Sequence, residues 1–239
     1  MASEPASDPF LTTRWSLVRA AAGDDVRGER ALQELCSVYW YPLYAYIRRR
    51  GYSREDAEDL TQAFLGNLLE RGDFRDTDPQ AGKFRAWLLA ALKNFLANDH
   101  DRRTAAKRGG GCIHLSFDWT TADRRFQLAG PEGAGPEECF DREWARALLE
   151  TVLRRLEKEW REAGRSEQFA LLKPCLTVSG EMDAAAGEAL GLSPVALRVA
   201  VHRLRLTYRR LLKEEITHTL GEGGDAEEEL RALAVAFRT

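Results

Sequence analysis

The 239-residue sequence has few cysteines, no run of strand-like alternation and no internal repeat. Its four cysteines lie far apart and form no CxxC pair, which argues against a disulfide framework or a zinc knuckle. Cys112 and His114 alone make a weak metal pair. No cofactor motif appears, because no Gly-rich phosphate loop follows a strand and no Ser/His or Cys/His nucleophile signature is present. The sequence therefore predicts neither a cofactor nor an enzyme.

Long apolar segments are also missing. The longest unbroken apolar run, 86–92, covers seven residues, far fewer than the roughly 20 that span a bilayer. The N-terminal residues 1–10 are acidic and Pro-rich, without the basic and apolar regions of a signal peptide. We therefore expect a soluble, cytoplasmic protein with no membrane partner.

The charge is nearly balanced overall, with a net charge of -3 and a pI near 5.9. Any surface that binds nucleic acid must therefore come from positive charge concentrated in part of the chain. Two segments are locally basic: 83–108 has seven Lys or Arg against two Asp, and 193–213 has six Lys or Arg and no acid. Such one-signed charge favours phosphate contact, although an ordinary basic surface helix remains the alternative.

The segment 183–213 has the pattern of a helix-turn-helix. A short Ala-rich helix over 184–190 meets Gly191, and Ser193-Pro194 then provides an N-cap hydroxyl and a proline at the first position of a longer helix. Along that helix Leu197, Val201, Leu204, Tyr208 and Leu211 share one apolar stripe, with Arg198, His202, Arg205 and Arg209 on the neighbouring stripe. The pattern predicts one face to bury and one cationic face to expose. Gly187 is expected to weaken the first helix by about 1 kcal/mol relative to alanine.

An acidic helix is predicted after Gly51. Ser53 is a candidate N-cap with Asp56 three residues later, an acidic variant of the capping box. The predicted buried stripe is Ala57, Leu60, Phe64 and Leu68, and the opposite face collects Glu55, Glu58, Asp59 and Gln62. On its own this acidic face favours simple solvation over contact with a partner.

A third helix, from Phe84, carries an aromatic stripe next to basic residues. Basic residues beside aromatic rings can hold single-stranded DNA by phosphate attraction and base stacking. The alternative is that the stripe forms core, which fits Phe84, Leu88 and Phe95 better than Trp87.

The predicted fold is all-α, with two small helical domains joined by a flexible linker and a helix-turn-helix in the second domain. A helix over 29–50 is expected to bend or divide at Pro42. The expected division is a flexible leader (1–11), a first domain (12–111), a Gly/Pro-containing linker (112–136), a second domain (137–218) and a C-terminal extension with a short helix (219–239). The linker segment 115–128 is a candidate for ordering on a partner.

Three motifs in this order resemble a known family. The segment 54–64, REDAEDLTQAF, is similar to the DAEDLxQexF signature of the second conserved region of bacterial sigma factors. Residues 84–88, FRAWL, followed by Asn94 and 99–103, are similar to the promoter-melting pattern of that region. LGLS at 190–193 with 199–205 and Arg209 is similar to the fourth region. Because only these two regions are present, the chain resembles the extracytoplasmic-function subfamily of the sigma-70 family over roughly 12–215.

The resemblance implies roles for particular residues. The acidic face would bind the β′ clamp helices of core RNA polymerase through Glu55, Glu58, Asp59 and Gln62. The loop 73–82 would bind and open the minus-10 element together with Lys83, Arg85, Trp87, Asn94, Arg102 and Arg103. The minus-35 element would be contacted by Ser193, Val195, Arg198, Val199, His202 and Arg203, with Arg205 and Arg209 on phosphates. Implied partners are core RNA polymerase, including its β flap, promoter DNA and, as a further candidate, an anti-sigma factor.

The chain also departs from that family pattern. Ala63 stands where the signature has an acid, and the linker and the segment after Leu220 exceed the minimal plan. The extra segments suggest an inhibitory role. Three rival functions are an autonomous regulator that binds duplex DNA without polymerase, an enzyme, which the missing nucleophile and phosphate-loop signatures disfavour, and an all-helical adaptor, which would leave the basic faces unexplained.

Overall fold

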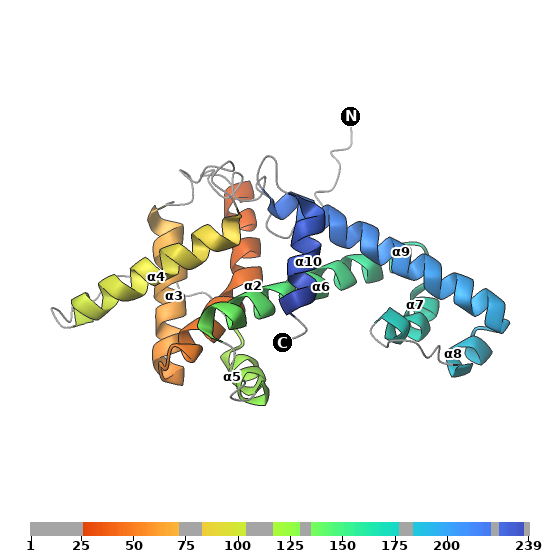
Figure 1. Cartoon of the computed structure of the whole chain (residues 1–239), viewed down its shortest axis with the longest axis horizontal. Helices are drawn as coiled ribbons and strands as arrows, with labels where there is room; N and C mark the ends of the chain where they lie inside the picture. The colour runs from red at the N-terminus through yellow and green to blue at the C-terminus, as the bar shows by residue number, and fades with distance from the viewer. Residues whose placement is uncertain are drawn as a thin grey trace. The chain divides into compact units, whose positions relative to one another are not determined.

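The computed structural model describes residues 26–71, 83–103, 117–129, 135–176, 184–220 and 225–236. Every regular element within these ranges is a helix, so the prediction of an all-α fold is confirmed (Figure 1). None of the helices in this part of the chain is both long and apolar enough to cross a membrane. The expected leader (1–11), the loop 73–82 and the glycines 109–111 lie outside the described residues.

The chain divides into two compact units. Unit 1 comprises residues 1–148 and 216–239, and unit 2 comprises 149–215. The first boundary falls inside helix α6 (Pro136–Glu162) and the second inside α9 (Pro194–Thr219). This division differs from the predicted one, because the chain passes from one unit to the other within continuous helices and not within the segment 112–136.

Unit 1 is built on α2 (Val26–Arg49), α3 (Arg54–Arg71) and α4 (Phe84–Arg103). Helix α2 continues through Pro42, so of the two outcomes expected at this proline, a bend or a division, the division does not occur. All residues of α2 from 41 to 47 are buried, including Tyr44, and so is Tyr39. The Tyr39 ring meets the Phe84 ring of α4 edge-on, with centroids 5.6 Å apart. Large aromatic side chains thus hold α2 against its neighbour.

Helix α3 begins as the sequence predicts. The Ser53 hydroxyl oxygen accepts a hydrogen bond from the Asp56 amide at 3.0 Å and itself donates to the Asp56 carboxylate at 3.0 Å. Leu60 and Phe64 of the predicted stripe are buried, and the Phe64 ring lies 5.5 Å from that of Phe95 in α4. The cap fixes where α3 begins, and the apolar stripe determines which of its faces is buried.

The segment predicted as a flexible linker contains α5 (Trp119–Leu128), which belongs to unit 1. Asp118 caps this helix by accepting from the Thr121 amide at 3.0 Å. The Phe117 ring stacks on the Trp40 ring of α2, with centroids 4.9 Å apart. The expectation that this segment is flexible is therefore wrong for 117–129: its aromatic side chains find their partners on α2.

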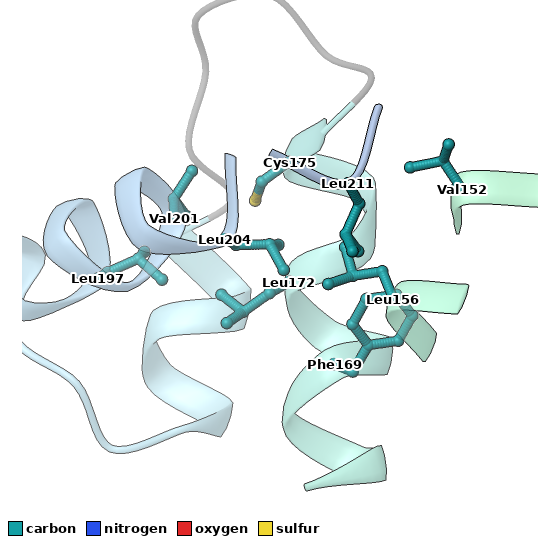
Figure 2. Close-up of a cluster of buried hydrophobic side chains, with 9 residues drawn as sticks. All are labelled: Val152, Leu156, Phe169, Leu172, Cys175, Leu197, Val201, Leu204 and Leu211. Atoms are coloured by element: carbon teal, nitrogen blue, oxygen red, sulfur yellow. The ribbon is translucent and has the colours of Figure 1, made fainter. Parts of the chain in front are cut away.

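Unit 2 packs the second part of α6 against α7 (Ser166–Leu172), the 3-10 turn η3 (Lys173–Leu176), α8 (Ala184–Ala189) and α9. Its core is the cluster drawn in Figure 2, in which Leu197, Val201 and Leu204 of α9 face side chains of α6 and α7. Leu211 of α9 is fully buried in the same cluster. Four of the five residues predicted for the apolar stripe of α9 are thus core, while Tyr208 is half-buried at its edge.

Candidate functional site

The turn between α8 and α9 has the conformation that its sequence predicts. Gly191 has φ +62, in the left-handed region that favours glycine. The Ser193 hydroxyl accepts from the Ala196 amide at 3.3 Å, and Pro194 is the first residue of α9. These residues fix where α9 begins.

Gly187 in α8 has a packing reason that the sequence did not reveal. A Cβ atom at this position would lie 3.1 Å from Cδ2 of Leu197, a core residue of α9. Glycine at this position therefore allows α8 to approach α9 closely, although it lowers the helix propensity of α8.

The solvent-facing side of α9 collects most of the residues predicted to contact duplex DNA. Exposed there are Ser193, Val195, Arg198, Val199, His202, Arg203 and Arg209. Two of these side chains are apolar, Val195 with 62% and Val199 with 44% of its surface accessible, and Leu206 follows with 52%. An exposed helix face that combines arginines with apolar side chains is suited to a partner that is anionic and carries apolar groups.

Arg205 differs from the other arginines of this face. Its guanidinium donates two hydrogen bonds to the Cys175 backbone oxygen, from Nε at 3.2 Å and from Nη2 at 2.7 Å. Cys175 lies in η3, where the end of a short helix leaves carbonyl groups to be satisfied. Arg205 therefore links α9 to η3, an interaction that the prediction of a phosphate contact did not include.

A cavity of about 250 Å³ opens beside α9 in unit 2. Arg203 and Thr207 line one side of it, and Trp160 and Arg165 line another. The Arg165 guanidinium lies 4.5 Å from the centre of the Trp160 ring, a cation-π contact. No local pattern predicts this cavity, because its lining comes from three separate helices or helix ends.

The predicted acidic face of α3 is only partly free of internal contacts. Glu55 and Asp59, one helical turn apart, are exposed, whereas Glu58 and Gln62 are half-buried. Arg54 donates from Nε to the Glu58 carboxylate at 2.7 Å, and this hydrogen bond raises the pKa of Arg54. Glu55 and Asp59 are consequently the best-exposed members of the face.

The residues predicted to bind the minus-10 element lie on or just before α4, and the structure divides them into two groups. Trp87 is half-buried next to the Phe84 ring, with centroids 5.4 Å apart, and Asn94 is exposed. Lys83 and Arg85 instead form ion pairs inside unit 1. Arg102 and Arg103 belong to α4, but their side chains lie outside the described residues.

The ion pairs of Lys83 and Arg85 share one carboxylate. Both cations contact Glu229 of the C-terminal helix α10 (Ala226–Ala236). Arg85 also lies 3.2 Å from the Asp141 carboxylate and 4.4 Å from the centre of the Trp144 ring, both on α6. Partial burial, followed by the nearby Arg85 charge, lowers the pKa of the Lys83 ammonium. Two residues predicted to bind DNA thus form ion pairs with carboxylates of the same chain.

Two more buried carboxylates organise unit 1 and were missed by the sequence analysis. Asp123 of α5 accepts from the Tyr44 hydroxyl at 3.1 Å and from the Gln127 amide at 2.6 Å. Glu143 of α6 accepts from Arg125 at 2.6 Å. Tyr44 lies 79 residues from Asp123 and Arg125 lies 18 residues from Glu143, so local periodicity could not identify these two contacts.

Within the described ranges no group of three or more His, Cys, Asp or Glu is placed to hold a metal ion. Cys112 and His114, the weak metal pair of the sequence, lie outside those ranges. Cys36, Cys139 and Cys175 are buried as free thiols.

Comparison of the chain with protein-family models, with curated proteins and with solved structures finds no match in any of the three. A function must therefore be inferred from its own residues and their geometry.

Proposed function

We propose that the chain is an RNA polymerase sigma factor, which binds core polymerase, directs it to particular promoters and helps to open the DNA. The observation that carries the proposal is the two-faced helix α9. One face is core of unit 2, while Arg198, His202 and Arg209 are exposed on the other. A helix of this kind can enter the major groove of duplex DNA with its cations near phosphates.

The turn before α9 supports this proposal. In a DNA-binding helix-turn-helix the second helix must start at a fixed place and angle relative to the first. Gly191, with φ +62, and the Ser193 cap provide a fixed start, and Leu197 packs close to Gly187 of α8. In the proposed interface Arg198 and Val199 read base edges and Arg209 contacts phosphate, while Val195 is suited to a thymine methyl group.

The polymerase-binding role rests on α3 and on its resemblance to the second sigma region. Glu55 and Asp59 present two exposed carboxylates one turn apart on a helix that is capped and packed on its other side. A rigid acidic face fits a basic helical surface, as the resemblance implies for the β′ clamp helices. Glu58 and Gln62 would extend this contact.

The proposed promoter-opening role belongs to α4. Trp87 combines partial exposure with support from the Phe84 ring, so it can stack on a base that leaves the duplex. Asn94, Arg102 and Arg103 follow on the same helix. No covalent chemistry by this chain is required, since captured bases and polymerase contacts would together stabilise the open strands.

The test is co-elution of the purified chain with bacterial core RNA polymerase at moderate salt. The informative variant is Glu55→Lys/Asp59→Lys, because both side chains are exposed and reversing them breaks no Arg54–Glu58 hydrogen bond. We expect co-elution of the native chain and its loss in this variant. A matched control, Glu162→Lys/Glu167→Lys, reverses two exposed charges in unit 2 and should still co-elute.

Absence of co-elution for the native chain would contradict the sigma-factor proposal. Tight binding of duplex DNA by the same sample would then favour an autonomous regulator that uses α9 alone.

A further inference from the structure

The C-terminal helix α10 places one carboxylate against the two cations at the start of α4. Glu229 is only 1% exposed and contacts both Lys83 and Arg85, from which it is separated by more than 140 residues of sequence. The side chain of Arg85 is itself only 15% exposed. A buried carboxylate between two cations is a specific interaction and not a chance surface pair.

Glu229 reaches this position because of the way α10 packs. The first turn of α10 contains three acids, Glu227, Glu228 and Glu229, but Glu227 and Glu228 are exposed. Leu233, four residues after Glu229 and therefore on the same face, is 6% exposed. An apolar anchor and a charged one thus hold a single face of α10 within unit 1.

The place that Glu229 occupies has the chemistry of a phosphate site. Lys83 directly precedes α4 and Arg85 lies in its first turn, which contains no acidic residue. The N-terminus of a helix attracts an anion through its free amide groups and dipole, and an arginine and a lysine add charge-assisted hydrogen bonds. A carboxylate and a phosphate would compete for the same two cations.

We propose that α10 is an internal competitor of nucleic acid, with the Glu229 carboxylate in the position of a phosphate group of the promoter strand. This inference rests on the proposed function, since that function assigns Lys83 and Arg85 to promoter DNA. In the free chain α10 covers the cation pair, and single-stranded DNA binds to α4 only when α10 is displaced. The competitor is part of the same chain, so its effective concentration is high and a weak contact suffices.

The test measures binding of a fluorescent single-stranded oligonucleotide to the full chain by anisotropy over a range of salt concentrations. Glu229→Gln keeps the shape of the side chain but removes its charge, and we expect binding to tighten on the order of tenfold. The slope of log affinity against log salt should steepen by about 0.7 for each phosphate newly contacted. The matched control Glu227→Gln makes the same charge change on an exposed side chain and should stay within about twofold of the native chain.

A second variant releases α10 without replacing any residue of the ion pairs. Leu233→Ala removes the apolar anchor of α10 and should also tighten oligonucleotide binding, although less than Glu229→Gln. The competition proposal is overturned if neither variant binds the oligonucleotide more tightly than the Glu227→Gln control.

Chemical labelling separates this outcome from failure of the proposed function. Acetylation of Lys83, followed by mass spectrometry without DNA, should be slow in the native chain and faster in Glu229→Gln; equal rates would overturn the Lys83–Glu229 contact. Co-elution with core polymerase uses α3 and needs neither cation of the pair. Retained co-elution together with unchanged oligonucleotide binding would therefore reject the competitor and leave the sigma-factor proposal standing.

Discussion

Replacing Asp123 by asparagine tests whether α5 is an integral part of unit 1. The side chain of Asp123 is only 8% exposed and lies 3.5 Å from Arg48 and 3.8 Å from Arg54. It also accepts from the Tyr44 hydroxyl and the Gln127 amide. Burial raises the pKa of the Tyr44 hydroxyl, and the charge and hydrogen bond of Asp123 raise it further, whereas the Arg48 charge acts in the opposite direction. The phenol therefore keeps its proton and can donate a hydrogen bond to the Asp123 carboxylate.

The expected cost follows from these contacts. Asparagine keeps one acceptor oxygen, but its amide group faces donors where the second carboxylate oxygen stood, and Arg48 loses a partly buried counter-charge. Arg54 contributes less, because its side chain is 40% exposed and water screens it. One mismatched buried hydrogen bond and one weakened ion pair together predict a loss of about 2 kcal/mol in the free energy of unfolding of unit 1.

The assay is urea unfolding combined with hydrogen exchange of the peptide that contains α5. The control Asp118→Asn changes the same residue type in the same element, and asparagine is as good an N-cap as aspartate, so stability should change by less than about 0.5 kcal/mol. Asp123→Asn should in addition accelerate exchange throughout α5. If the two variants were equally stable and equally protected, the buried carboxylate would not be what holds α5 on α2.

Four further outcomes are expected. Arg198→Ala should weaken binding to selected promoters unevenly, whereas Arg209→Ala should weaken all of them and lower the salt slope; equal losses at every promoter for both changes would reject this division of roles. Gly191→Ala should destabilise unit 2 by about 1 kcal/mol in thermal unfolding, entirely through its φ of +62, because an added Cβ would meet nothing within 4 Å. Burial raises the pKa of the Cys36 thiol to about 12 from 9.0, so native protein at pH 8 should resist alkylation at Cys36 until urea is added. Because this pKa is raised in the folded state, the thiol's contribution to stability is complete below about pH 9 and is lost between pH 9 and 12, which unfolding curves over that range would show.

Features of the fold that depend on local sequence were predictable. The start of α3 at Ser53 and that of α9 at Ser193-Pro194 follow from capping chemistry, which acts over three or four residues. The buried faces of these helices follow from periodicity, because apolar residues recur at helical spacing along each of them. Leu60 in α3 and Leu197 and Val201 in α9 lie on these faces and are buried. The all-α class follows from the same two signals.

Features that depend on contacts between distant residues were not predictable in this way. The segment 112–136 contains enough Gly and Pro to indicate a linker, yet Asp118 caps a helix inside it and Phe117 stacks on Trp40. The Asp118 cap and the two aromatic residues beside it were a usable signal for a helix. No local signal, however, could reveal that its partner is α2.

The candidate site shows why basic residues cannot be assigned to DNA from their positions in the sequence alone. Arg205 has the same helical register as the other arginines of α9, and Arg85 lies in a motif as suggestive as theirs. What separates them is the nearest acceptor: Arg205 is bound to the Cys175 carbonyl, and Arg85 to Glu229. A cation with an internal acceptor must exchange it for a phosphate, so its net contribution to DNA binding is a difference between two interactions. Arg198 and Arg209, exposed on α9, would need no such exchange if they meet DNA as proposed, and they should therefore contribute to binding before α10 is displaced.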